Sequence, residues 1–303
     1  MIRFSNLDGS RSPKFFKMLK RVINKKDMTL KGAPAPIVKP DIHKLHRRIT
    51  KHGHVRLTWL GHSGWLVQLA NHNFIIDPMM TNVSGVIRNH ARFEADIKQL
   101  PKIDATIITH DHYDHLNKRL VKKIGARIIT GFDISRDLSF TKLPCTELKW
   151  WESLMMEDIK ITFVPSQHGA RRSMLDRNSR LWGGFIFEAP GVCLYHAGDT
   201  AYYDGFRRIQ EKFKNIQIAL MPIGAYGPEK SRAENHLTPE QAIKAFKDLR
   251  AKYFLPMHWG TFKLTDEPLD EPPQRLTAEW DQKKLSSNKL KFFAVGESRT
   301  FKF

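Results

Sequence analysis

The amino-acid sequence predicts a layered α/β fold with two β-sheets. Short apolar runs bounded by turn residues, such as Val55–Leu60 and Trp65–Leu69, are typical of buried strands. The first three runs follow one another directly, whereas the later runs alternate with helical patterns. This order favours antiparallel strands first and strand–helix units afterwards. A chain of 303 residues, 41% of them apolar, can bury the core that such a fold requires.

The remaining elements follow from the same patterns. Further strands are expected at Phe74–Asp77, Ala105–Thr109, Arg127–Thr130, Ile159–Val164, Gly184–Phe187, Val192–His196, Ile216–Met221 and Phe254–Met257. Helices are expected at Leu116–Ile124, Phe206–Phe213, Pro239–Leu249 and Leu276–Leu285. The third helix has a clear start, because Thr238 and Gln241 form a capping box around Pro239 at the first helical position. The acidic, proline-rich stretch Asp266–Pro273 is expected to be a surface loop.

The positive charge of the chain is concentrated at its N-terminus. The net charge is +19, and residues 1–56 contain 15 Lys and Arg against three Asp and Glu. We therefore divide the chain into a basic N-terminal extension, residues 1–55, and a main domain, residues 56–303. An extension with this charge attracts polyanions, among them nucleic acid, anionic lipid and acidic substrates.

Within the extension, Lys14–Lys26 has a cationic amphipathic pattern. Its apolar side chains fall on one side of a helix and its lysines and arginines on the other. Two interpretations stay open: the helix lies on an anionic membrane surface, or it packs its apolar side on its own domain and leaves the basic side in solvent. The prolines of the following segment, Lys31–Pro40, favour an extended strap.

The composition favours a cytoplasmic protein. No run approaches the ~20 consecutive apolar residues that a membrane span needs, and the first residues lack the apolar core of a secretory signal. Two cysteines, Cys145 and Cys193, offer no disulfide framework, which is typical of a reducing compartment. Peripheral contact with the inner face of the membrane is the additional expectation if the amphipathic helix binds lipid.

The strongest local signal is a cluster of histidine and aspartate after an apolar strand, His110-x-His112-x-Asp114-His115. Alternate residues of an extended backbone project to the same side, so His110 and His112 can share one metal ion. Asp114 and His115 stand at the turn into the next helix and can reach a second ion beside it. Imidazole and carboxylate groups suit Zn²⁺, and also iron or manganese. The alternative is a chance group of solvated histidines, and their density argues against it.

Three more potential ligands each stand just past an apolar strand: His168, Asp199 and His258. Alone, each would be interpreted as a structural residue. Together they stand at strand ends, where sites on open α/β sheets gather. The sequence therefore predicts one metal centre that combines all seven side chains. We interpret His62 and His196, which also stand near strand ends, as structural or supporting residues.

The ordered set of these seven side chains resembles the metal motif of the metallo-β-lactamase superfamily. Further stretches are similar to the branch of that superfamily that hydrolyses N-acylphosphatidylethanolamine as a phospholipase D, and the resemblance runs from about Arg56 to the C-terminus. These stretches are Trp59-Leu60-Gly61-His62, Trp150-Trp151-Glu152, Pro165-Ser166-Gln167-His168, Leu181-Trp182-Gly183, Ala197-Gly198-Asp199-Thr200, Pro222-Ile223-Gly224-Ala225-Tyr226, Met257-His258-Trp259-Gly260-Thr261-Phe262, Glu271-Pro272-Pro273 and Gly296-Glu297-Ser298-Arg299. The N-terminal segment departs from this pattern.

The resemblance implies an αββα four-layer sandwich, two mixed β-sheets flanked by helices, with residues 56–303 as the catalytic domain. It implies two zinc ions, with Mn²⁺ or Fe²⁺ as alternatives. The implied ligands are His110, His112 and His168 for one ion, Asp114, His115 and His258 for the other, and Asp199 as the bridge. Two ions ~3.5–4 Å apart can share a water whose pKa falls toward ~7, so hydroxide forms at neutral pH and can attack phosphorus. Asp114 and His236 are the candidate catalytic residues.

Residues outside the metal set are candidates for substrate contact. His236 stands just before a predicted helix cap, in a loop where the family has a histidine near the substrate phosphate, and a helix N-terminus favours an anion. Arg171 and Arg172 follow His168 closely, and a guanidinium group matches the oxygens of a phosphate or head group. A solvated basic loop is the alternative for both arginines. Tyr113, inside the metal motif, is expected either to line the pocket or to pack.

These observations favour a zinc phosphodiesterase whose substrate is N-acylphosphatidylethanolamine or a related phospholipid. On the same scaffold, the alternatives are a metal-dependent nuclease, which the basic N-terminus would suit, and a phosphosugar lactonase. The sequence lacks the large insertions of RNA-processing relatives and any stacking-aromatic motif, which disfavours nucleic acid as the partner. A non-catalytic lipid- or nucleic-acid-binding protein with a vestigial site is the third hypothesis. The complete ligand set argues against it, because a decayed site loses ligands.

Overall fold

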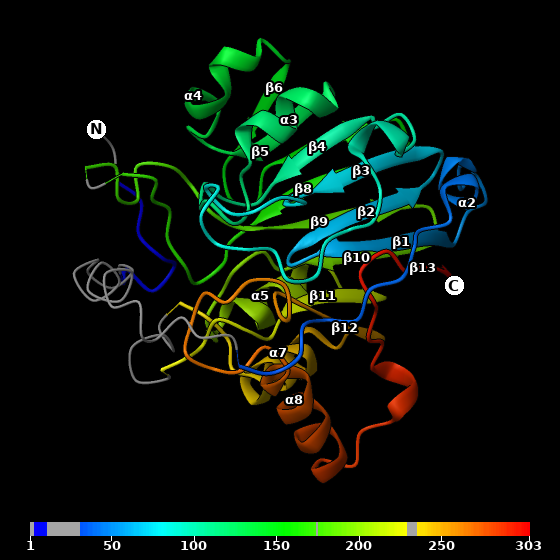
Figure 1. The fold of residues 1–303 in the computed structure, drawn as a ribbon, viewed down its shortest axis with the longest axis vertical. Coiled ribbons are helices and arrows are strands. Elements are labelled where there is room, and N and C mark those ends of the chain that lie inside the picture. The colour runs from blue at the N-terminus through cyan, green and yellow to red at the C-terminus, as the bar shows by residue number, and fades with distance from the viewer. Residues whose placement is uncertain (1–2, 11–30, 174, 229–234) are drawn as a thin grey trace.

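The computed structural model describes residues 3–10, 31–173, 175–228 and 235–303. Two β-sheets, of seven and six strands, pack face to face, and helices flank them on both sides (Figure 1). The apolar side chains of both sheets meet in one core, whose largest fully buried members include Trp59, Trp65 and Trp280. The predicted α/β class and the αββα sandwich that the resemblance implies are therefore confirmed.

The seven-stranded sheet has the strand order β13-β1-β2-β3-β4-β5-β6. Neighbouring strands are antiparallel from β13 to β3 and parallel from β3 to β6. The strands are β1 (His54–Gly61), β2 (Gly64–Leu69), β3 (His72–Ile76), β4 (Ala105–Ile108), β5 (Arg127–Gly131), β6 (Cys145–Leu148) and β13 (Ser298–Lys302). In this sheet, the chain thus forms hairpins first and strand–helix units afterwards, as the sequence predicts.

The six-stranded sheet has the strand order β12-β11-β10-β9-β8-β7. Strands β12, β11 and β10 run parallel, whereas neighbours from β10 to β7 are antiparallel. The strands are β7 (Ser153–Met156), β8 (Ile159–Val164), β9 (Gly184–Ala189), β10 (Val192–His196), β11 (Ile218–Pro222) and β12 (Tyr253–Met257). The loops after the three parallel strands consequently lie at one edge of the sheet.

Helices lie beside both sheets (Figure 1). The α-helices of the described ranges are α2 (Ile42–His46), α3 (Lys118–Ile124), α4 (Ser135–Leu138), α5 (Gly205–Lys212), α7 (Pro239–Leu249) and α8 (Glu271–Gln282). Helices α3 and α4 lie near β4 to β6, whereas α5, α7 and α8 lie near β11 and β12. The capping box predicted for α7 is present, since Thr238 Oγ1 accepts from Gln241 N–H and the Gln241 side chain accepts from Thr238 N–H.

Some elements differ from the sequence expectation. Helix α8 begins at Glu271, so the loop expected at Asp266–Pro273 is confirmed for residues 266–270 and wrong for the last three residues. Prolines in the first turn of a helix sacrifice no intrahelical hydrogen bond, which explains why they do not stop α8. The sequence patterns also miss β6, β7 and β13. All three are edge strands, and most of their side chains are only partly buried or exposed.

The described parts of the N-terminal extension pack on residues 56–303. Ala35 is buried and its N–H donates to the carbonyl of Gly260, and Leu45 belongs to the main core. The predicted amphipathic helix Lys14–Lys26 lies outside the described residues, so its membrane contact stays a prediction. Within the described ranges, no helix combines the length and the apolar character that a membrane crossing requires.

Candidate metal centre

The side chains of the predicted metal centre come from loops that follow strands of both sheets. The motif from His110 to His115 follows β4 in the seven-stranded sheet, whereas His168, Asp199 and His258 follow β8, β10 and β12 in the six-stranded sheet. The structure brings all seven predicted side chains together. They fall into groups whose nitrogen and oxygen atoms lie within 4.8 Å of one another.

The first group consists of His110, His112, His168 and Asp199. The Nδ1 atom of His112 lies 2.9 Å from Nε2 of His110 and 3.1 Å from Nε2 of His168. The Oδ2 atom of Asp199 lies 3.9 Å from the His110 nitrogen and 3.8 Å from the His168 nitrogen. Three imidazole nitrogens and a carboxylate oxygen thus surround one small space, and this donor set suits a four-coordinate metal ion.

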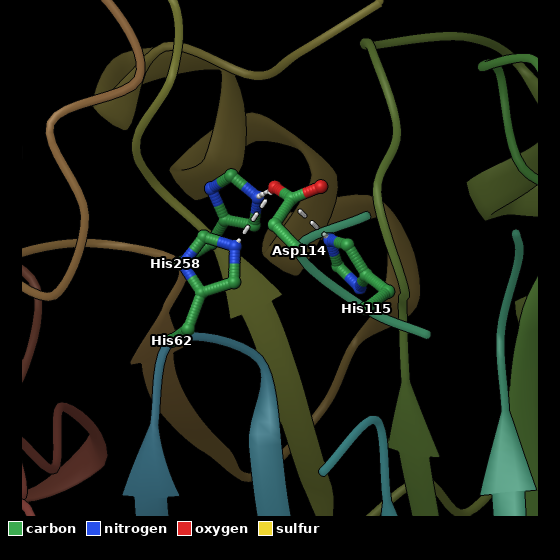
Figure 2. A group of neighbouring side chains, drawn as sticks. All are labelled: His62, Asp114, His115 and His258. Carbon is green, nitrogen blue, oxygen red and sulfur yellow. Dashed lines mark hydrogen bonds and ion pairs between the residues drawn. The ribbon is translucent and has the colours of Figure 1, made fainter. Parts of the chain in front are cut away.

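The second group consists of His62, Asp114, His115 and His258 (Figure 2). The Oδ2 atom of Asp114 lies 3.1 Å from Nε2 of His62, 3.7 Å from Nε2 of His258 and 3.8 Å from Nε2 of His115. Side chains from the loops after β1, β4 and β12 therefore meet at one carboxylate. His62, interpreted from sequence as a structural or supporting residue, lies within this group.

Asp199 stands between the two groups. Its Oδ1 atom lies 3.2 Å from Nε2 of His258, and its Oδ2 atom lies 3.3 Å from Nε2 of His115. The turn that places it needs Gly198, which has a φ of 61° and whose added Cβ would lie 2.6 Å from the carbonyl oxygen of Gly183. The Oδ2 atom of Asp199 also faces His110 and His168 of the first group, at 3.9 and 3.8 Å, so this buried carboxylate contacts both groups and can bridge two cations.

Asp77 fixes which nitrogen of two rings faces the site. Thr109 Oγ1 donates to Asp77 Oδ2 and can therefore accept from His110 Nδ1–H, at 2.9 Å. The same Asp77 oxygen accepts from His115 Nδ1–H at 2.7 Å. In both rings, Nε2 is consequently the nitrogen that remains for a cation. Asp77 is not among the residues predicted from the sequence, although it directly follows the apolar strand β3, as the predicted ligands follow their strands.

His168 is oriented by two distant segments. Its Nδ1–H donates to the carbonyl of Asn235 at 2.8 Å, which again leaves Nε2 for a cation. Its backbone N–H donates to Asn6 Oδ1, which also accepts from the indole N–H of Trp182. Residues 3–10 thus form an N-terminal strap over the loop of His168. No local sequence signal marks Asn6 as a supporting residue.

The buried polar atoms of the centre fit a metal cation. His115 Nε2, His258 Nε2 and Asp199 Oδ1 lie close together but make no aligned hydrogen bond among the described residues. A buried polar atom without a partner costs about 1–3 kcal/mol, and coordination to a cation removes that cost. Imidazole and carboxylate donors suit Zn²⁺, and also iron or manganese.

In the metal-free protein, burial and the carboxylates divide the histidines into neutral and protonated rings. Burial lowers the pKa of His112 to about 3. Burial also opposes a charge on His258, but the neighbouring Asp199 and Asp114 outweigh it and raise the pKa of His258 to about 9. The same two carboxylates, against the effect of burial, raise the pKa of His115 well above its usual range. These two rings must lose their protons before they coordinate a metal.

His236 lies at the edge of both groups. Its Nδ1 atom is 3.8 Å from Asp199 Oδ2. Its ring centre lies 5.1 Å from that of His168 and 5.6 Å from that of His258. The capping box at Thr238 fixes the chain two residues later. The structure thus places this candidate catalytic residue beside the carboxylate that can bridge the groups.

The three candidate substrate-contact residues lie beside the metal motif, and two of them, Tyr113 and Arg172, contact each other. The guanidinium carbon of Arg172 lies 4.2 Å from the ring centre of Tyr113, and one of its nitrogens donates to the carbonyls of Asp111 and Leu116. Tyr113 OH donates to the carbonyl of Arg172, and the backbone N–H of Arg171 donates to the Asp111 carboxylate. These bonds hold the metal-motif loop in place. A role of these side chains in substrate binding stays a prediction.

Known proteins are similar to this chain in fold and in sequence. Residues 72–259 match the family model described as the beta-lactamase superfamily domain. The chain belongs to the metallo-β-lactamase superfamily, and it is a metal-dependent hydrolase of that superfamily. The solved structure of Igni18, a metallo hydrolase from Ignicoccus hospitalis, superposes with a TM-score of 0.66 at 26% identity and covers 82% of this chain and 99% of its own.

Relatives in sequence include enzymes with a named substrate. The N-acyl-phosphatidylethanolamine-hydrolyzing phospholipase D 1 of Caenorhabditis elegans is 32% identical over 76% of this chain and 72% of its own length. The mitochondrial enzyme of this type from Saccharomyces cerevisiae is 33% identical, but the match spans only 52% of its length. An uncharacterized protein of Mycobacterium tuberculosis is 30% identical over 82% of this chain and 68% of its own length. The resemblance inferred from the sequence motifs is confirmed.

Zinc binding to the metal-free protein is expected to release protons at pH 7. His115 and His258 carry protons there, because their pKa values are raised, and coordination requires neutral rings. The apparent zinc affinity should therefore weaken as the pH falls below about 9, the pKa of His258. Calorimetric titration in two buffers with different ionisation enthalpies measures the released protons. A binding enthalpy independent of the buffer would contradict this expectation.

Replacement of Asn6 by alanine should destabilise the fold by about 1–3 kcal/mol, because the backbone N–H of His168 loses its acceptor in a buried place. Ser5→Ala is the matched control in the same strap: Ser5 is only partly buried and its side chain makes no hydrogen bond among the described residues, so a change within about 0.5 kcal/mol is expected. Urea denaturation of the three proteins gives the free energies of unfolding. Equal values for both variants would show that the N-terminal strap does not hold the His168 loop.

Proposed function

We propose that this chain is a dinuclear zinc phosphodiesterase that hydrolyses N-acylphosphatidylethanolamine or a closely related phospholipid in the manner of a phospholipase D. The observation that carries the proposal is the position of Asp199, whose buried carboxylate faces histidines of both groups: His115 and His258 of the second at 3.3 and 3.2 Å, and His110 and His168 of the first at 3.9 and 3.8 Å. Such an arrangement serves two neighbouring cations better than one. The 32% identity to the phospholipase D 1 of Caenorhabditis elegans supports the substrate class.

The proposed ligands are those that the superfamily resemblance implies. One ion would be held by His110, His112 and His168, the other by Asp114, His115 and His258, with Asp199 as the bridge. When bound, two such ions supply a hydroxide nucleophile at neutral pH and neutralise charge on phosphoryl oxygens. The protein keeps the donor nitrogens in place through Asp77 and the carbonyl of Asn235.

We propose that His236 donates a proton to the leaving group. Hydrolysis forms a bond between the hydroxide oxygen and phosphorus and breaks the bond from phosphorus to the ethanolamine oxygen. The departing alkoxide needs a proton, which a positioned imidazole can donate. His236 is suited to this role because its ring lies beside Asp199, at the edge of both ligand groups. The products would be phosphatidic acid and an N-acylethanolamine.

The zinc-loaded full chain is expected to convert N-acylphosphatidylethanolamine in mixed micelles to these two products, which mass spectrometry measures. Structured RNA and a phosphosugar lactone serve as parallel substrates for the alternative functions. Cleavage of RNA alone, or of the lactone alone, would overturn the lipid proposal.

The variants His112→Ala and Asp199→Ala should keep the fold and lose turnover, because each removes a metal donor. Turnover retained in either variant would require a different active centre.

His236→Gln should lower kcat on the phospholipid by about 10²- to 10⁴-fold, the usual contribution of a general acid. The loss should be much smaller on bis(p-nitrophenyl) phosphate, since p-nitrophenolate departs without a proton. Zinc content should stay unchanged in this variant. An equal loss on both esters would exclude proton donation to the leaving group as the role of His236.

A further inference from the structure

His62 belongs to the second group but not to the seven ligands that the superfamily resemblance implies. It is buried, with 2% of its surface exposed, just past the end of β1. Its Nε2 atom lies within hydrogen-bond distance of Asp114 Oδ2, at 3.1 Å. Its ring packs against that of His258 with the centres 3.9 Å apart (Figure 2). One histidine thus contacts two of the proposed ligands of the second ion.

The backbone of His62 is held from three directions. Its N–H donates to Thr261 Oγ1, and its carbonyl accepts from the indole N–H of Trp59 and from the backbone N–H of His258. Both His62 and His258 have a positive φ, 53° and 63°. This conformation is unfavourable for residues other than glycine, and it persists where the surroundings impose it, often at functional sites. The structure therefore fixes both the ring and the backbone of His62.

The contact with Asp114 defines what His62 can do. A carboxylate oxygen only accepts, so Nε2 of His62 must carry the proton and donate it. A nitrogen with that proton has no lone pair for a metal. The second ion already has four donors in Asp114, His115, His258 and Asp199, which completes a four-coordinate site. His62 is therefore suited to orient a ligand rather than to be one.

Asp114 is the ligand that needs such support. Its side chain is 17% exposed, whereas the side chains of His115, His258 and Asp199 are at most 1% exposed. A carboxylate at the solvent edge can rotate away from the site unless a hydrogen bond holds it. His62 supplies that bond from the buried side, and its ring contact keeps His258 facing the same place.

We propose that His62 is a positioning residue of the second metal site, which orients Asp114 by a hydrogen bond and supports His258 by ring packing. This inference rests on the dinuclear site of the proposed function. Partners of metal ligands typically contribute 10- to 100-fold to metal affinity. The affinity for the first ion should not depend on His62, because none of His110, His112 and His168 makes a described contact with it.

The test is a zinc titration of the metal-free full chain against a competing chelator, which yields separate affinities for two ions. His62→Ala should weaken the second affinity by about 10- to 100-fold and leave the first unchanged. His62→Gln should restore most of the loss, because its amide N–H can donate to Asp114. His72→Ala is the matched control: His72 is also nearly buried, but it begins β3 at the opposite end of the same sheet. It should retain both affinities.

The variants separate positioning from other roles. An unchanged second affinity in His62→Ala would overturn the proposal, and so would an equal loss at both ions, which indicates a general structural role. A loss in His62→Ala that His62→Gln does not restore would indicate direct coordination instead. Failure of the proposed function shows in the wild-type chain, as uptake of one zinc or as no lipid hydrolysis. Failure of the His62 inference shows only in the comparison of variants.

Discussion

The attraction between buried carboxylates and buried imidazoles is the interaction on which this centre depends. Seven histidines and three aspartates meet there, and burying so many polar groups is costly unless their charges balance. Asp199 and Asp114 keep His115 and His258 protonated in the absence of metal. The same carboxylates can instead neutralise cations. Protons and metal ions can therefore balance the charge of the same two carboxylates.

Contacts behind the proposed ligands come from remote parts of the chain. Asp77 orients His115 directly and His110 through Thr109, and Asn6 accepts from the backbone of His168. Each contact fixes the orientation of a ligand residue that its own loop does not fix. A strand end can deliver a histidine to the right region, but the nitrogen that faces the metal is selected by a second hydrogen bond. The positions of the ligand nitrogens thus depend on residues from remote parts of the chain.

This division explains what the sequence could predict. The buried strands and the seven ligand candidates were predictable, because continuous apolar runs and the chemical groups that follow them are local patterns. The edge strands β6, β7 and β13 were not, since a strand with one unpaired side needs no continuous apolar run. Asp77 and His62 follow strands as the ligands do, but as single residues they cannot be told from structural ones. Asn6 acts through tertiary contact alone.

The two proposed metal sites also have a consequence for the fold. Each group takes side chains from both sheets: His110 and His112 follow β4 and face His168 after β8, while Asp114 and His115 face His258 after β12. An ion bound in either group would join the two sheets, so its binding free energy would also stabilise their packing. The protein has its own link at the same place, the hydrogen bond from the backbone of His258 to that of His62. That bond joins the loop after β1 to the loop after β12 across the two sheets, so the sheets do not depend on metal alone to bring the ligands together.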